Sequence, residues 1–399
     1  MPKIPPRSAE LPRSGIRAVM DLAWASTAPV IRLEVGQPDA APPEHVLEAI
    51  TASIQRKETG YTPNAGIPEL RAACADKLAR VNRIHVDADQ VLITAGSMQG
   101  LSATALALAD PGDEVLVPDP GWPNYRMVSR LTSLQAVPYP LRRETGYRPD
   151  FDELAHLVGE RTRMVVINSP SNPLGVVWDA AVMSDWVRFA EEHDLWIVSD
   201  ECYDQIVLDD LLEDAGVAEG PAAASSAVAV SPAALPGGSE RVVTVHSFSK
   251  TYAMTGLRVG YVSGPPEVLA TMVKMQEALV ACVNGPAQHG AVAALQGPQE
   301  FVSERRESYR RRRDRAIEVS DELGLPYQRP SGAFYLWLPL RLHGRSGVEL
   351  AEELVRDAGV AVAPGETFGS EGEGAIRVSL AAAEDDIAAG LRRIVAHLG

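Results

Sequence analysis

The sequence predicts an α/β fold built on a mostly parallel sheet, with a ligand site at the carboxyl edge of that sheet. Short apolar runs, many of them β-branched, alternate with segments of helical periodicity along the 399 residues. Glycine, serine, asparagine and charged residues gather directly after several of these runs, where parallel strands present ligand residues. The expected strands are 31–35, 91–94, 114–117, 164–167, 195–198 and 242–245.

Segments of helical periodicity separate and follow these runs. Residues 15–25, for example, carry apolar side chains at Ile16, Val19, Met20 and Leu22, spaced along one face of a helix. Further helices are expected at 44–57, 267–281, 287–296, 301–323 and 348–357. One more begins at 67, and another ends at 108. Later strands are expected at 331–337, 360–364 and 375–380.

Composition and charge narrow the class of partner. Apolar residues make up 46% and charged residues 23% of the chain, which is ordinary for a soluble globular protein. Lysine and arginine number 37 against 53 acidic residues, a net charge of −16 that argues against nucleic acid and anionic membranes as partners. An anionic ligand would therefore need a locally basic pocket.

Cysteine usage and the chain start favour a cytoplasmic protein. Cys74, Cys202 and Cys282 lie far apart with no Cys-x-x-Cys, so we expect neither a disulfide framework nor a metal site. The first residues lack the apolar segment of a signal peptide, and no apolar run approaches the roughly 20 residues that span a bilayer.

One lysine stands in an unusual place. Lys250 follows the apolar run 242–245 within Ser-Phe-Ser-Lys, and Gly-Leu-Arg-Val-Gly comes shortly after it. A lysine beside a buried strand loses proton affinity and becomes a nucleophilic amine, as Schiff-base chemistry requires. The serines and Arg258 nearby would suit a phosphate. Taken alone, a loop lysine is more often a solvated one.

Several motifs together resemble the class I/II aminotransferases, the fold-type I pyridoxal-phosphate enzymes. The resemblance runs from Gly36 to Ser379 in the order and approximate spacing of that family. Single motifs are weak, whereas their joint occurrence is specific. They are Gly-x-Pro-Asp at 36–39, Tyr-x-x-x-x-Gly-x-x-x-Leu-Arg at 61–71, Asn-x-Pro-x-Asn-Pro-x-Gly at 168–175 with Leu174 where threonine is common, Asp-Glu-x-Tyr at 200–203, Ser-x-Ser-Lys at 247–250, Gly-Ala-Phe-Tyr at 332–335, Pro-Gly-x-x-Phe-Gly at 364–369 and the strand arginine Arg377.

The resemblance implies pyridoxal 5'-phosphate as cofactor and a transamination in two halves. Lys250 would hold the cofactor as a Schiff base, be displaced by the amino acid, and then move the α-proton. Asp200 would pair with the protonated pyridine nitrogen and strengthen the electron sink. Tyr203 completes the catalytic set and, with Asn172, would hydrogen-bond the ring hydroxyl.

The resemblance also assigns binding roles. Trp122 would stack on the cofactor ring, a role that a large flat side chain suits. The phosphate would be held by Gly96, Ser97, Met98, Ser247 and Arg258, with Tyr61 reaching it from a partner subunit. Arg377 would bind the substrate α-carboxylate, and Gly36, Trp122 and Asn172 would line the substrate site. A cis peptide is expected at Asn172–Pro173.

The family architecture implies a three-layer large domain, a smaller domain and a homodimer with shared sites. We expect residues 1–36 to form an arm and helix of the small domain, 37–285 the large cofactor-binding domain, and 286–399 the rest of the small domain. Residues 1–14 read as an extended arm. Residues 209–240 read as a flexible surface insertion longer than is usual in the family, because 215–238 is rich in Ala, Ser, Pro and Gly.

Other functions remain open at this stage. The cofactor motifs also serve β-elimination lyases and enzymes that cyclise an aminopropyl substrate, as aminocyclopropane-carboxylate synthase does. Effector-binding modules of regulators share the fold, but residues 1–35 are too short for a DNA-binding domain. The amino donor is expected to have a neutral side chain, since no second arginine occupies a motif position. Trp122, Tyr125 and the helix at Ile16 to Met20 favour an apolar or aromatic one. A second arginine in the side-chain pocket would overturn that prediction.

Overall fold

A computed structural model describes residues 4–9, 11, 13–209, 227–340, 342 and 344–399. The strands are β1 (Ile31–Arg32), β2 (Val91–Thr94), β3 (Glu114–Asp119), β4 (Gln135–Pro140), β5 (Thr162–Asn168), β6 (Trp196–Asp200), β7 (Val242–Ser247), β8 (Gly260–Ser263), β9 (Tyr335–Pro339), β10 (Val360–Ala361), β11 (Ala363–Pro364) and β12 (Ala375–Ser379).

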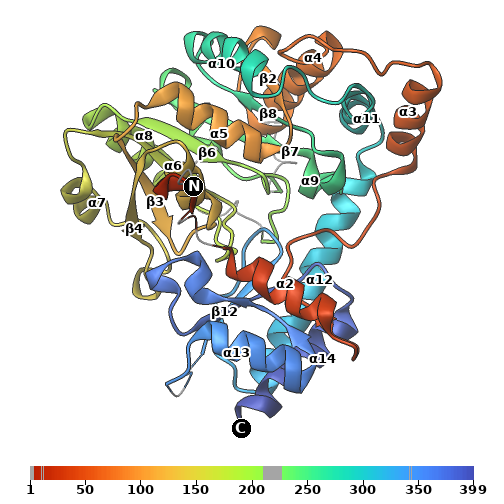
Figure 1. The fold of residues 1–399 in the computed structure, drawn as a ribbon, viewed down its shortest axis with the longest axis vertical. Coiled ribbons are helices and arrows are strands. Elements are labelled where there is room, and N and C mark those ends of the chain that lie inside the picture. The colour runs from red at the N-terminus through yellow and green to blue at the C-terminus, as the bar shows by residue number, and fades with distance from the viewer. Residues whose placement is uncertain (1–3, 10, 12, 210–226, 341, 343) are drawn as a thin grey trace, which may run out of the picture.

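The α-helices connect and cover these strands (Figure 1). They are α1 (Pro6–Ala9), α2 (Gly15–Ala25), α3 (Glu44–Gln55), α4 (Pro68–Lys77), α5 (Ser97–Leu108), α6 (Asn124–Leu131), α7 (Phe151–Leu157), α8 (Ala180–Glu192), α9 (Phe248–Thr251), α10 (Pro266–Leu279), α11 (Gly285–Gln296), α12 (Glu300–Glu322), α13 (Gly347–Glu353) and α14 (Glu384–Leu398).

The main sheet has seven strands in the order β2-β8-β7-β6-β5-β3-β4. All neighbouring pairs are parallel except those of β8, which runs antiparallel to both β2 and β7. The carboxyl ends of β2, β7, β6, β5 and β3 therefore meet at one edge, where parallel sheets bind ligands. The predicted α/β fold with a mostly parallel sheet is confirmed.

Helices cover both faces of this sheet. Along β5, Val165 and Ile167 pack into a core shared with α7 and α8, whereas Met164 and Val166 pack with α5, α6 and α10. Successive residues of a strand point to opposite faces of the sheet, so a strand that is apolar throughout buries both faces. The three layers that the resemblance implied are therefore present.

The chain ends build a second region below the sheet in Figure 1. Strands β11, β12 and β9 form an antiparallel sheet, and β1 pairs in parallel with β10. Residues of α2, α12, α13 and α14 share one hydrophobic core with these strands. The N-terminal segment of the chain thus packs with its last hundred residues.

Several element boundaries differ from the predictions. The strand expected at 331–337 begins only at Tyr335, after a turn, and the one at 31–35 shortens to β1. The helix expected at 348–357 is α13 followed by the π-helical turn Leu354–Ala358. β4 was not predicted, because this edge strand is partly exposed and carries two prolines.

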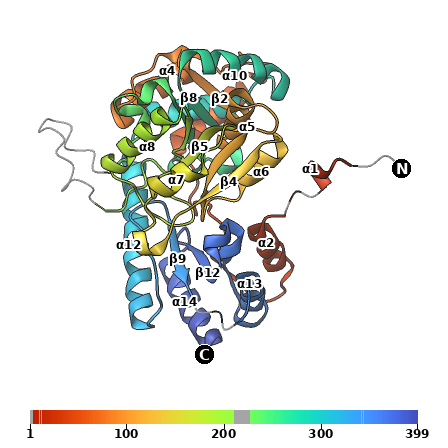
Figure 2. The ribbon, with the colours of Figure 1, turned by 90° about the vertical axis from the view of Figure 1, so that its left-hand side faces the viewer.

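The two segments expected to lack structure need correction. Within 1–14, residues Pro6–Ala9 form the short helix α1, which lies on the outside of the molecule next to α6 (Figure 2). Of the insertion 209–240, residues 210–226 lie outside the described part. The remainder is not a loose surface loop, because Ser231 is buried and short 3-10 helices span Pro232–Ala234 and Gly238–Glu240.

In the part of the chain that the structure describes, no helix combines the length and apolarity needed to cross a bilayer.

Candidate active site

A cavity of about 370 Å³ opens at the carboxyl edge of the main sheet. It is bounded on one side by strand ends and on the other by α2 and the second region. Eight of the predicted site residues line it: Gly36, Ser97, Trp122, Asn172, Asp200, Tyr203, Lys250 and Arg377. Residues up to 341 positions apart in sequence therefore converge on one pocket, as the motif order predicted.

Lys250 is placed by a short helix that directly follows β7. Its helix, α9, is capped by Ser247, whose side chain accepts a hydrogen bond from the Ser249 backbone N–H. The Lys250 Nζ donates to the Gly36 carbonyl oxygen across the pocket. Burial lowers the pKa of Lys250 to about 8, and the nearby Arg377 and Arg258 contribute to the decrease. A neutral amine is therefore accessible near physiological pH.

Asp200 ends β6 and is 3% exposed. Its Oδ2 accepts a hydrogen bond of 2.7 Å from the Tyr125 hydroxyl, and its Oδ1 accepts one of 3.2 Å from the Cys202 N–H. Burial raises the pKa of this carboxyl, although these hydrogen bonds oppose the increase. A carboxylate held like this favours a cationic partner in the cavity.

Arg377 is a fully buried arginine in β12. Its Nη1 donates to the Asn172 side-chain oxygen at 2.8 Å, and its Nη2 donates to the Glu34 carbonyl oxygen. Its Nε is buried without a hydrogen-bond partner among the described residues. The guanidinium also lies 4.2 Å from the centre of the Tyr335 ring. An anion in the pocket would complete the hydrogen bonding of this cation.

The turn from β2 to α5 forms a second cationic corner. Gly96 has a φ of +76°, and a Cβ built on it would lie 2.5 Å from the Arg258 Nη2. Only glycine lets the guanidinium approach this backbone so closely. The N-terminal N–H groups of α5, which begin with Ser97 and Met98, lie beside that charge, an arrangement suited to a phosphate.

Tyr203 and Asn172 are both held in place by neighbours. The Tyr203 and Tyr335 hydroxyls lie 2.7 Å apart, and the Asn168 side chain accepts from the Asn172 N–H at 2.8 Å. The Asn172–Pro173 peptide is cis, as predicted. These contacts fix the polar wall of the cavity between Arg377 and the end of β6.

Gly96, Met98, Ser247, Arg258 and Tyr61 are not among the residues that line the cavity. The first four adjoin it through the contacts of the β2–α5 turn and of α9. Tyr61 is 93% exposed.

Sequence reasoning missed several residues that surround the cavity. Asn168, Cys202 and Tyr335 line it, and so does Arg17 of α2. Asn168 and Tyr335 belong to motifs quoted above, so they could have been assigned. Tyr125 was expected only beside the substrate side chain, and its hydrogen bond to Asp200 was not foreseen. Arg17 is a second arginine on the cavity lining, so the prediction that the donor side chain must be neutral is overturned.

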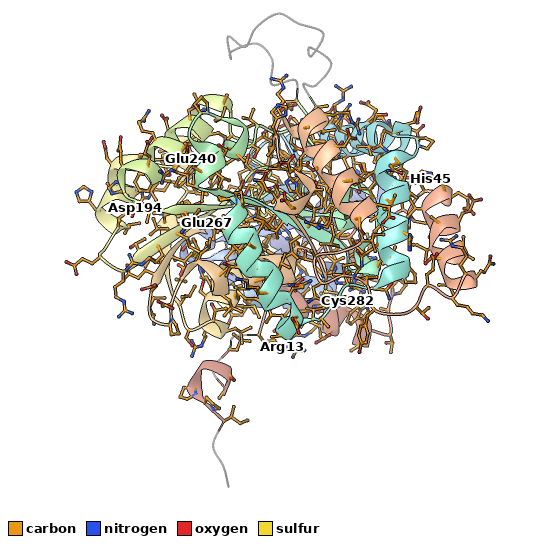
Figure 3. The ribbon with its side chains drawn as sticks, turned by 90° about the horizontal axis from the view of Figure 1, so that it is seen from above. Arg13, His45, Asp194, Glu240, Glu267 and Cys282 are labelled. Carbon is orange, nitrogen blue, oxygen red and sulfur yellow. The ribbon has the colours of Figure 1, made fainter. Side chains whose placement is uncertain are left out.

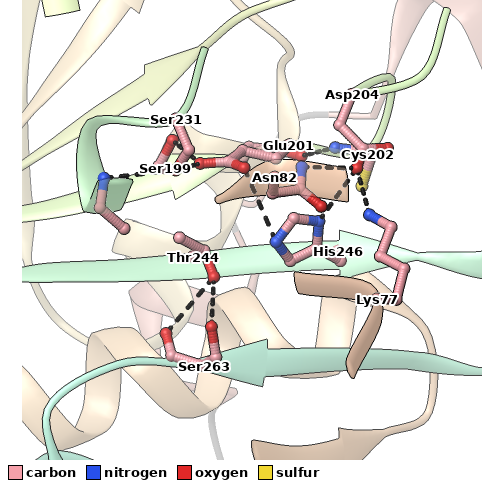
Figure 4. A network of polar contacts seen from close by, with 12 residues as sticks. Lys77, Asn82, Ser199, Glu201, Cys202, Asp204, Ser231, Thr244, His246 and Ser263 are labelled. Atoms are coloured by element: carbon pink, nitrogen blue, oxygen red, sulfur yellow. Dashed lines mark hydrogen bonds and ion pairs between the residues drawn. The ribbon is translucent and has the colours of Figure 1, made fainter. Parts of the chain in front are cut away.

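A buried polar network lies behind the Asp200 turn (Figure 4). Lys77 forms an ion pair with Asp204, which also accepts a 3.0 Å hydrogen bond from Asn82. The His246 ring lies 3.8 Å from Asp204 and 3.7 Å from Glu201. The Glu201 Oε1 accepts from Ser231 at 2.6 Å and from Ser199 at 2.8 Å. Sequence analysis assigned no role to these residues apart from Glu201, which it quoted only as part of a motif.

Comparisons with known proteins agree with this geometry. A family model described as aminotransferase class I and II matches residues 28–394. A probable aspartate/prephenate aminotransferase of Aquifex aeolicus is 36% identical over 372 residues, which cover 92% of this chain and 90% of that protein. An aspartate aminotransferase of Pyrococcus abyssi is 35% identical over 384 residues, covering 96% and 94%.

Solved structures show the same relationship. Aspartate aminotransferase from Thermus thermophilus with maleate has a TM-score of 0.90 at 35% identity, covering 99% of this chain and 100% of that one. An aromatic aminotransferase from Pyrococcus horikoshii has a TM-score of 0.86 at 34% identity, covering 96% and 98%.

The residues present fit pyridoxal phosphate, the cofactor of this family. The glycine-lined corner at Gly96 suits its phosphate, the buried Asp200 suits its ring nitrogen, and the amine of Lys250 suits its aldehyde. The chain belongs to the class I and II aminotransferases and is a pyridoxal-phosphate-dependent enzyme that transfers an amino group from an amino acid to a 2-oxo acid.

Proposed function

We propose that the cavity is the transamination site, that its apolar wall accepts amino donors with neutral side chains although Arg17 also lines the cavity, and that Lys250, Asp200 and Arg377 carry the reaction. One observation supports this most directly: the three residues lie on one cavity, and none of them has, among the described residues, a charged partner of the kind its proposed role requires. Pyridoxal phosphate, when bound, supplies an electron sink for charge that develops at the substrate α-carbon.

Arg377 orients the substrate by its α-carboxylate. Two of its nitrogens are already engaged by Asn172 and Glu34, so the guanidinium is fixed in place, and its Nε is buried without a hydrogen-bond partner in the described ranges. A fixed donor costs little entropy at the moment of binding. Anchoring the carboxylate here places the α-carbon within the cavity that Lys250 lines.

Lys250 takes the α-proton and returns it. A group that moves a proton works best when its pKa lies near the operating pH, and burial has brought the Lys250 pKa to about 8. Asp200, whose carboxylate is buried and hydrogen-bonded by Tyr125, stabilises positive charge at the cofactor ring. Tyr203 and Asn172 would bind the ring hydroxyl, Trp122 would stack on the ring, and Gly36 would close the substrate side.

Ser97, Met98, Ser247 and Arg258 hold the phosphate around the Gly96 corner. The positive φ of Gly96 brings the backbone close to the Arg258 side chain, and α5 directs its N-terminal N–H groups to the same corner. Backbone donors and one arginine together can satisfy a dianion.

The wall around the substrate side chain is mainly apolar. Ile16, Met20, Val35, Trp122 and Met127 contribute to it. Apolar side chains pack favourably on such a surface, which favours donors such as leucine, methionine or phenylalanine. The relatives are named aspartate, aspartate/prephenate and aromatic-amino-acid aminotransferases, so acidic and aromatic donors belong in the same test.

A panel of amino donors tests the function. The purified holoenzyme is incubated with leucine, methionine, phenylalanine, tyrosine, aspartate and glutamate, each with 2-oxoglutarate and with pyruvate. Formation of the keto acid of the donor together with the amino acid of the acceptor marks transamination. Ammonia release without an amino acid product would instead indicate elimination, and a cyclic product would indicate cyclisation. A strong preference for aspartate would overturn the neutral-donor proposal.

We also propose that two chains form a homodimer with shared sites, divided as expected into 1–36, 37–285 and 286–399. The 93% exposure of Tyr61 supports this, because an aromatic ring left in water is a common sign of an interface. The pairing of β1 with β10 supports assignment of the N-terminal segment to the small domain. The net charge and cysteine content favour a cytoplasmic enzyme without nucleic-acid partners.

Mixed dimers test the shared site. Lys250→Ala chains are mixed with Tyr61→Ala chains. If Tyr61 acts across the interface, the hybrid has one intact site and its activity rises above that of both parents, provided that Tyr61→Ala is itself impaired. Verified hybrids without a rise in activity would place Tyr61 outside the partner's site.

A further inference from the structure

Arg17 stands apart from the other cations of the cavity. It lies on α2, and its side chain is exposed, whereas Lys250 is half-buried and Arg377 is buried. The first turn of α2 and the residue before it supply Ser14, Ile16 and Arg17 to the cavity lining, and Met20 follows one turn later. Arg17 is therefore a cation set beside the apolar wall that receives the substrate side chain.

The ion pairs of α2 leave Arg17 available. Its natural helical partner is Asp21, four residues further on. That carboxylate is instead paired with Arg13, which precedes the helix at the base of the N-terminal arm (Figure 3). Arg17 has no hydrogen bond or ion pair to any residue of the described ranges. Turning its guanidinium toward a ligand would therefore break no existing contact.

The remaining charges of the cavity lining have other roles. Arg377 is fixed by Asn172 and Glu34, and Lys250 contacts Gly36. Asp200 lies at the ring end, bound to Tyr125. A second carboxylate on a substrate would therefore meet apolar side chains with Arg17 as its nearest available cation, and a carboxylate facing such a wall needs a charged partner.

We propose that Arg17 binds the distal carboxylate of a dicarboxylic substrate, such as a five-carbon 2-oxo diacid acceptor, while neutral donors use the apolar wall beside it. The inference rests on the proposed transamination function. Donor and acceptor of a transaminase occupy one site in alternate halves of the cycle, so one pocket must accept both. A long, exposed arginine that is unpaired among the described residues meets this need. Its guanidinium stays in water when the substrate side chain is apolar, and it forms an ion pair when the substrate side chain is acidic.

Variants that remove only the charge test the proposal. Arg17→Met keeps an unbranched stem without the guanidinium, and Arg17→Lys keeps the charge without the planar fork. Arg80→Met is the matched control, because Arg80 is also an exposed helical arginine, in the π-helical turn Leu78–Asn82 that follows α4, and is paired with Asp76 outside the lining. Binding of glutarate, a non-reacting five-carbon diacid, is measured on each holoenzyme by calorimetry. The ratio of kcat/KM for 2-oxoglutarate to that for pyruvate is measured in parallel.

We expect Arg17→Met to weaken glutarate binding about 10-fold and to lower the 2-oxoglutarate/pyruvate ratio by a similar factor, as expected for a solvent-exposed charge-assisted contact. Arg17→Lys should restore part of both effects, and Arg80→Met should show neither. Arg13→Met supplies an independent test, because it frees Asp21 to recapture Arg17 and should shift both quantities in the same direction as Arg17→Met.

Unchanged glutarate affinity and an unchanged ratio in Arg17→Met would overturn the proposal, as would equal changes in Arg80→Met or a wild-type enzyme that does not bind glutarate. If the wild type transaminated no acceptor, the proposed function would fail, and the glutarate measurement would still decide the role of Arg17.

Discussion

Two lysine–aspartate sets lie on opposite sides of one turn and behave in opposite ways. In the cavity, Lys250 and Asp200 form no ion pair with each other, and burial lowers the pKa of the lysine to about 8 and raises the pKa of the carboxyl. Four residues further on, Asp204 pairs with Lys77. Burial alone would raise the pKa of Asp204, but Lys77, His246 and Asn82 together outweigh burial, and the pKa is lowered.

This contrast separates groups that act on ligands from groups that hold the fold. A buried charge with a permanent partner is satisfied and unreactive. A buried group without such a partner has a shifted pKa and favours a ligand of opposite charge. The same residue types therefore acquire opposite roles through their neighbours alone.

Lys250→Ala should produce the largest effect. It removes both the attachment point of the cofactor and the group that moves the α-proton, so the rate should fall about 10⁴-fold or more. Borohydride treatment of the wild type should fix the cofactor to the peptide that contains Lys250. Lys274→Ala, which changes an exposed lysine of α10, is the control and should retain activity. Labelling of a different lysine would contradict the assignment.

Asp200→Asn should come next. The amide keeps the shape and the contact with Tyr125 but loses the charge, so proton transfer should slow roughly 10²–10³-fold while cofactor still binds. The half-reaction with excess amino donor, followed in a stopped-flow spectrometer, measures this step. Asp204→Asn is the matched control, because it should lower the melting temperature more than it lowers this rate. A near wild-type rate in Asp200→Asn would remove its electronic role.

Lys77→Met should act on stability instead of chemistry. The change leaves Asp204 buried without its cation, which typically costs about 3–5 kcal/mol. Lys250→Met should cost the apoprotein far less, because that amine has no carboxylate partner to abandon. Urea midpoints of the two apo variants provide the comparison, and adding Asp204→Asn to Lys77→Met should recover part of the loss. Equal midpoints would mean that the two lysines do not differ in this way.

The cavity residues Lys250 and Asp200 could be predicted from the sequence. Buried parallel strands are apolar at both phases, so their ends are easy to find, and Lys250 and Asp200 lie in motifs at those ends. Their convergence on one cavity follows from the sheet order, which the alternation of strands and helices indicated.

The buried network could not be predicted in the same way. Lys77, Asn82, Asp204 and His246 come from three separate segments, and each is an ordinary polar residue in its own local context. Ser231 lies in a stretch whose small residues indicated a loose loop, yet it is buried against Glu201. Arg17 was missed because its partner Asp21 is taken by Arg13, a choice that helical spacing does not reveal.

Glu201 gives the smallest expected effect. It belongs to the buried network, yet its pKa is shifted as those of the cavity groups are. Burial raises its pKa to about 7, although Ser231 and Ser199 donate hydrogen bonds to it. Between pH 4.5 and 7 the folded protein therefore holds a proton that the unfolded chain has released, so stability should decrease as pH rises through this window. The neutral amide of Glu201→Gln should remove that slope, a difference on the order of 2–3 kcal/mol between pH 5 and 8. Urea midpoints across this range measure it, with Glu349→Gln on the exposed start of α13 as the control. Parallel curves for the wild type and Glu201→Gln would show that Glu201 stays ionised, and would place it with the satisfied groups such as Asp204.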